Sequence, residues 1–176
     1  MNLLFNIIKA SSFLLLFGIV FLVGCNGNEV NLIDGDQHIT EEMDEVISDY
    51  IIQRYSPIYT DTEKQFEVHK VYGTSESNGV IDVYMWSYYG GFNKSTGMEN
   101  HAGHSLAAVI RLSKNGETYS VIKYTEPQDG DLYQSSLKKM FPEKYLKLVQ
   151  QDSGNIGALQ KEMDEKVKRW LEMQET

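Results

Sequence analysis

The sequence predicts an α+β domain in which one helix precedes a four-stranded antiparallel meander and further helices follow it. Three observations support this class. An apolar stripe at helical spacing follows Thr40, two pairs of strand-like runs are joined by Asn-Gly turns, and more helical stripes lie near the C-terminus. When helices pack on one antiparallel sheet, the apolar faces of all these elements are buried.

The first predicted helix begins after Thr40, whose hydroxyl suits an N-cap. Acidic side chains follow at once and would face the positive end of the helix dipole. Ser56-Pro57 ends the pattern, because the residue before a proline avoids helical geometry. The apolar stripe consists of Met43, Val46, Ile47, Tyr50 and Ile51.

Two hairpins follow. Residues 64–73 and 80–89 are rich in β-branched and aromatic side chains and flank Asn78-Gly79, and residues 104–113 and 118–125 flank Asn115-Gly116. Asn-Gly between such runs is a strong hairpin signal. His69 falls in the first of these strands and gains no partner from the sequence alone.

Three helices are expected after the sheet. A short one starts near Asp131, Pro142 occupies the first turn of the next, and a stripe from Leu159 to Leu171 marks the last. The order of helix and four-stranded sheet resembles cystatin-like and NTF2-like layouts. A shared layout does not give function.

The chain is acidic, with a net charge of −9. Lys9 is the only charged side chain before Cys25, so the remainder carries about −10. Such a domain repels nucleic acid and anionic lipid surfaces, and nucleic acid is therefore excluded as a partner. The expected organisation is a signal peptide over residues 1–24, a flexible tether over 25–38 and a single domain over 39–176.

The N-terminal segment is typical of a secretory signal. Lys9 provides the positive flank, and the apolar run over residues 13–23 is shorter than the roughly 20 residues that a membrane-spanning helix needs. Extending the run toward the N-terminus would place Lys9 inside the bilayer at a cost of a few kcal/mol.

Leu22-Val23-Gly24-Cys25 resembles the lipobox of bacterial lipoproteins. The resemblance implies cleavage between Gly24 and Cys25, and a diacylglycerol on the Cys25 thiol. Two acyl chains give durable attachment to a bilayer where one chain would not. The alternatives are a free core cysteine and an uncleaved anchor. No other cysteine is present, which agrees with export to an oxidising compartment.

The connection between the hairpins, residues 88–105, is long for a loop, and long loops are often functional. It contains Glu99, His101 and His104, a carboxylate and two imidazoles that could hold zinc. The alternative is a polar loop with incidental histidines, since spacing of three outside a helix does not put both rings on one side. The common catalytic motifs are missing, and no cofactor is expected.

The segment from Val121 to Tyr145, together with the final helix, resembles uncharacterised small lipoproteins of spore-forming Gram-positive bacteria. It is also similar to the outer C-terminal region of some beta-lactam sensor-transducer membrane metallopeptidases. The resemblance implies a folded module outside the membrane without assigned catalysis. The positions that carry it are Tyr124, Glu126, Pro127, Asp129, Gly130, Tyr133, Ser136, Met140, Phe141 and Pro142.

The sequence therefore predicts a lipoprotein domain held at the outer face of the cell membrane through acylated Cys25, where it binds or senses an envelope protein, a peptide or another ligand without catalysis. The alternative is a small metal-dependent envelope enzyme that uses the connection over residues 88–105. A purely structural envelope protein is a third class.

Overall fold

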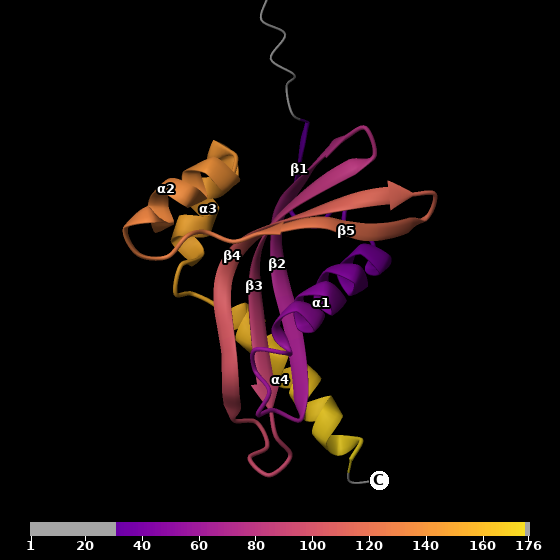
Figure 1. The fold of residues 1–176 in the computed structure, drawn as a ribbon, viewed down its shortest axis with the longest axis vertical. Helices are drawn as coiled ribbons and strands as arrows, with labels where there is room; N and C mark the ends of the chain where they lie inside the picture. The colour runs from indigo at the N-terminus through magenta and orange to yellow at the C-terminus, as the bar shows by residue number, and fades with distance from the viewer. Residues whose placement is uncertain (1–30, 175–176) are drawn as a thin grey trace, which may run out of the picture.

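The structure, a computed structural model, describes residues 31–174. Its elements form one five-stranded sheet and several helices (Figure 1). In chain order they are β1 (Leu32–Asp34), α1 (Glu41–Tyr55), β2 (Lys64–Ser77), β3 (Val80–Phe92), β4 (Asn100–Asn115), β5 (Thr118–Thr125), the 3₁₀ turn η1 (Gly130–Leu132), α2 (Tyr133–Met140), α3 (Glu143–Asp152) and α4 (Gly157–Glu172).

The α+β class is confirmed, but the sheet has five strands rather than four. The strands follow the order β1-β2-β3-β4-β5, and every neighbouring pair is antiparallel. The extra strand β1 lies in the segment predicted as a tether and pairs Leu32 with Ser75 and Asp34 with Gly73. Three residues are too few to show a strand period, so this strand left no pattern in the sequence.

Helix α1 follows its prediction closely. The Thr40 side chain accepts a hydrogen bond from the backbone N–H of Met43 at 3.2 Å, and the helix ends at Tyr55, before Ser56-Pro57. The expected stripe is the buried face, since Met43, Ile47 and Ile51 are fully buried. Capping and amphipathic spacing together fix this helix.

Both Asn-Gly turns are also present. Asn78 and Gly79 have φ angles of 54° and 73°, the pair of positive values that a type I′ hairpin turn requires. At the second tip, Asn115 pairs with Thr118 across the turn, and Gly116 has a φ of 66°.

The prediction of a long connection over residues 88–105 is wrong. Strand β3 continues to Phe92 and β4 begins at Asn100, which leaves residues 93–99 as the connection. Gly90, Gly91 and Gly103 look like loop signals, but they lie within paired strands. At Gly103 a Cβ atom would overlap the backbone carbonyl of Tyr89, so the close strand approach there requires glycine.

Helices cover both faces of the sheet (Figure 1). Helix α1 packs against β2 and β5 on one face, while α3 and α4 pack against β2 and β3 on the other. Two separate groups of buried apolar side chains result, one under α1 and one under α2, α3 and α4. Because both faces are covered, nearly every residue of β3 is buried.

Gly73 provides a test of the packing between β1, β2 and α3. A Cβ atom at this position would overlap the Tyr145 hydroxyl and the backbone oxygen of Ile33. Gly73→Ala should lower the free energy of unfolding by about 1–3 kcal/mol, the usual cost of overpacking. Urea denaturation measures the change. Gly157→Ala is the matched control, because a Cβ at the start of α4 meets nothing within 4 Å and alanine favours helix. An equal loss in both variants would contradict the packing described.

Candidate functional site

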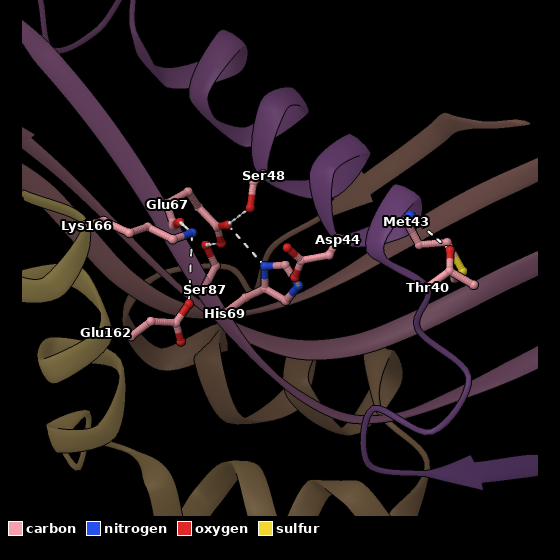
Figure 2. Close-up of polar contacts among 9 residues, drawn as sticks. All are labelled: Thr40, Met43, Asp44, Ser48, Glu67, His69, Ser87, Glu162 and Lys166. Carbon is pink, nitrogen blue, oxygen red and sulfur yellow. Dashed lines mark hydrogen bonds and ion pairs between the residues drawn. The ribbon is translucent and has the colours of Figure 1, made fainter. Parts of the chain in front are cut away.

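A buried carboxylate lies between α1 and the sheet. Glu67, on β2, is 1% exposed, and three side chains donate hydrogen bonds to it (Figure 2). Ser87 Oγ donates to Oε1 at 2.7 Å, and Ser48 Oγ of α1 donates to Oε2 at 2.7 Å. His69 Nδ1 lies 3.1 Å from the same Oε2. The carboxylate is thus fully surrounded by donors, as a buried charge requires.

His69 joins this carboxylate to a second one nearer the surface. Its side chain is 2% exposed, and its Nε2 lies 3.2 Å from Asp44 Oδ1, whose side chain is 54% exposed. Asp44 and Ser48 are four residues apart on α1, so one face of the helix reaches both ends of the chain of contacts. The result is an acid–imidazole–acid series that runs from solvent to the core.

The pair consists of a charged histidine and a charged glutamate. Burial alone would raise the pKa of Glu67, but the charge of His69 and the hydrogen bonds from His69, Ser87 and Ser48 outweigh it and hold that pKa below its ordinary value. Burial alone would lower the pKa of His69, but the charge and hydrogen bond of Glu67 and the charge of Asp44 raise it. Each group therefore favours the charged form of the other.

Helix α4 contacts the same strand from the other face. Lys166 Nζ donates a hydrogen bond to the backbone carbonyl of Glu67 at 2.9 Å and lies 3.9 Å from Glu162 Oε1 (Figure 2). Glu67 lies opposite Tyr89 of β3, but β1 pairs only with residues 73–75 of β2, so no strand lies along the outer side of β2 at residue 67. Residue 67 thus connects α1 through its side chain and α4 through its backbone.

Two surface hollows meet at His69. The first, of about 440 Å³, lies between β2, β3 and the start of α4. The second, of about 280 Å³, lies at the N-terminal end of α1 and includes Thr40 and Asp44. The walls of the first consist of His69, Lys70, Trp86, Asp152, Asn155, Ile156, Ala158, Leu159 and Glu162.

The arrangement is better suited to holding a ligand than to acid–base chemistry. A general base must be unprotonated at working pH, whereas the charges of Glu67 and Asp44 raise the pKa of His69 and so favour its protonated form. Both serine hydroxyls donate to Glu67, whose lowered pKa makes it a weak base toward them, and Ser87 is fully buried. The larger hollow has the volume of a typical small-ligand site and mixes apolar walls with a few charged groups at its rim.

The three residues predicted as metal ligands are not brought together. Glu99 precedes β4, His101 and His104 lie within it, and an odd spacing in a strand sends side chains to opposite faces. His101 is exposed and hydrogen-bonds to the Thr96 hydroxyl. Across residues 31–174, no group of three histidine, cysteine or acidic side chains is arranged to hold a metal ion.

His104 belongs to the aromatic core under α1. Its ring stacks on Tyr89, with centroids 5.3 Å apart and planes 6° apart, and lies 4.1 Å from the Tyr55 ring. Burial lowers the pKa of His104 to about 4. The two buried histidines therefore behave oppositely, because His69 has a carboxylate beside it and His104 has tyrosines.

Gly24 and Cys25 lie outside the described residues. Within residues 31–174 no helix is long and apolar enough to cross a bilayer. Comparisons with protein families, curated proteins and solved structures gave no match to this chain.

The Glu67–His69 pair was not predicted from the sequence, although one signal for it was present. Glu67 and His69 are two residues apart and so share one face of a strand. The next strand, VIDVYMWSYYGGF, is apolar on both faces, which indicates a sheet covered on both sides. Polar side chains of β2 beside such a strand must therefore be buried and paired.

The opposite shifts of the two histidines predict a stability maximum near pH 6.5, the ordinary pKa of histidine. Above it, the folded chain keeps a proton on His69 that the unfolded chain has lost, so stability falls as pH rises. Below it, the unfolded chain binds a proton at residue 104, whereas His104 in the folded chain does not bind one until about pH 4, so stability falls as pH falls. Each limb should approach about 1.4 kcal/mol per pH unit.

Urea denaturation between pH 5 and 8 measures both limbs. His104→Phe should flatten the acid limb, and the double variant Glu67→Gln, His69→Gln should flatten the alkaline limb without leaving a lone buried charge. His101→Gln is the matched control, because this histidine is exposed, and it should keep both limbs. A wild-type profile without a maximum would contradict the assignment.

Proposed function

We propose that the chain is a lipoprotein whose domain is held on the outer face of the cell membrane, where it binds or senses an envelope protein, a peptide or another ligand without catalysis. The observation that carries the binding role is the hollow of about 440 Å³ between β2, β3 and α4. The lipobox-like sequence at residues 22–25 supports the location.

The chemistry of the hollow suits recognition. Trp86, Ile156 and Leu159 provide apolar surface, and Lys70 forms an ion pair with Asp152 at its rim. Apolar walls supply affinity, and a few fixed charges supply orientation. The Glu67–His69 pair beneath holds β2 in place, so the hollow is largely formed before a ligand arrives.

The anchor predicts a defined covalent state. In the protein purified from its native membrane, mass spectrometry should find Cys25 as the first residue with acyl chains attached and residues 1–24 removed. Cys25→Ser should retain residues 1–24 and carry no acyl mass, because a hydroxyl cannot form the thioether. Asn26→Ala, one residue beyond the cut, should be processed like the wild type. A native protein with residues 1–24 intact would contradict the anchor.

The binding role predicts contact with a specific partner at the hollow. Ala158 is exposed and lines the hollow, so a photo-crosslinking amino acid placed there should yield one discrete adduct in intact cells. Lys168, exposed on the same helix and outside the hollow, is the matched control and should yield none. Adducts with bulk surface proteins from both positions would favour the purely structural class instead.

A further inference from the structure

The first half of β4 is an open sheet edge. Residues 109–115 pair with β5, but residues 100–108 pair with β3 alone. We call the outer side of residues 101–108 the β4 edge. Figure 1 shows it as the free left margin of the lower sheet, and β3 and β5 are the elements that pack extensively against this strand. Backbone N–H and C=O groups on such an edge are available to another strand.

Every other outer edge in the described chain carries a feature that blocks strand addition. Strand β1 has three residues, and Lys144 contacts Asp34 on it at 2.7 Å. On β2, Lys166 donates a hydrogen bond to the backbone carbonyl of Glu67. Strand β5 bears Lys123 and a register irregularity opposite Arg111 and Leu112. Charged side chains, bulges and short length are the usual protections of sheet edges.

The β4 edge is protected only at its start, where the Ala102 N–H donates to the Asn100 side chain at 3.1 Å and the Gly103 carbonyl accepts a hydrogen bond from the Tyr59 hydroxyl at 3.4 Å. Its sequence, HAGHSLAA, contains no proline and no charged residue, and its register with β3 is regular from Ala102 to Ala108, whereas His101 has no partner beside the irregularity at Gly91 and Phe92. His101, Gly103 and Ser105 are exposed, and Ala102, His104 and Leu106 are half-buried. A hollow of about 330 Å³ follows residues 100–105 beside Tyr88. Small side chains on both faces leave room for the side chains of an added strand.

We propose that the β4 edge binds an extended peptide segment of a partner protein as a sixth strand. This inference rests on the proposed function and names the class of partner. The peptide should be neutral or basic, because Glu99 lies at one end of the edge and the chain carries a net charge of −9, while Glu126, just beyond β5 at the other end, is paired with Arg54 at 3.7 Å. Backbone hydrogen bonds would supply affinity, and the hollow beside Tyr88 would supply side-chain selection.

A second copy of the chain suits the edge less well. In a symmetric antiparallel pair of two β4 edges, the start of the edge in one copy would lie beside the β5 end of the edge in the other copy. Glu99 of each copy would then lie near Glu126 of the other. Both copies also carry a net charge of −9, so close approach would be opposed by repulsion between like charges.

The test uses the full-length protein in detergent micelles and a fluorescein-labelled probe, Lys-Thr-Val-Thr-Val-Thr-Val-Thr-Lys, which favours extended structure. Fluorescence anisotropy should show saturable binding, and replacing both lysines with glutamates should weaken it. Two further peptides carry N-methyl groups on the odd-numbered or on the even-numbered amides, which we call the two phases. One of these peptides should bind about tenfold more weakly, and the other should bind like the unmodified probe. Only pairing along one edge of a strand distinguishes the two phases.

Ala102→Lys should also weaken binding of the probe about tenfold, because a half-buried lysine on an edge obstructs a neighbouring strand. Ser120→Lys, at an exposed position of β5, is the matched control and should bind as the wild type does. Circular dichroism confirms that both variants are folded, and the N-methyl series needs no variant.

The proposal is overturned by absence of binding, by equal binding of the two N-methyl phases, or by a dimer in ultracentrifugation that Ala102→Lys dissociates, which would show a second copy on the edge. Failure here together with a discrete adduct at Ala158 would leave the proposed function standing. Failure of both would remove the binding role itself.

Discussion

The ion pair between Glu67 and His69 is the interaction on which the arrangement of the domain depends. Two charges removed from water cost several kcal/mol each unless every donor and acceptor is satisfied. Here Ser87 of β3 and Ser48 of α1 complete the shell of Glu67. A helix shifted by one turn could not supply both Ser48 and Asp44, so the pair fixes the position of α1 on the sheet.

The same strand carries that constraint to the opposite face. Lys166 bonds the carbonyl of Glu67, and the walls of the larger hollow come from β2, β3 and α4. A change in charge at His69 would directly disturb the packing of α1 on the sheet. It would also disturb the hollow, because β2 forms part of its wall. Ligand binding in the hollow, as proposed, would thus be connected to the protonation of the buried pair through one short segment of backbone, residues 67–70, rather than through the two apolar cores, which are separate.

The sequence predicted what local patterns determine and missed what depends on distant neighbours. Thr40 and the stripe of α1 are signals within one helix, and Asn78-Gly79 fixes its hairpin within four residues. Strand β1, by contrast, forms only by pairing with β2, which is distant in sequence. The contacts of His69 likewise depend on α1, which supplies Asp44, as well as on its own strand, which supplies Glu67. Glycines at 90, 91 and 103 look the same in a loop and in closely packed strands, so the connection was predicted too long.

The short distance between Cys25 and β1 affects how an anchored domain would be presented. Six residues lie between Cys25 and Leu32, and a fully extended chain from one to the other spans at most about 25 Å. If Cys25 carries the lipid, β1 must lie near the bilayer surface. Strand β1 pairs with the far end of β2, whereas the β4 edge lies on the other side of β3. The β4 edge would then face away from its own anchor, where it is accessible to a partner, and the like charges of the domain would oppose its pairing with lipid-held neighbours.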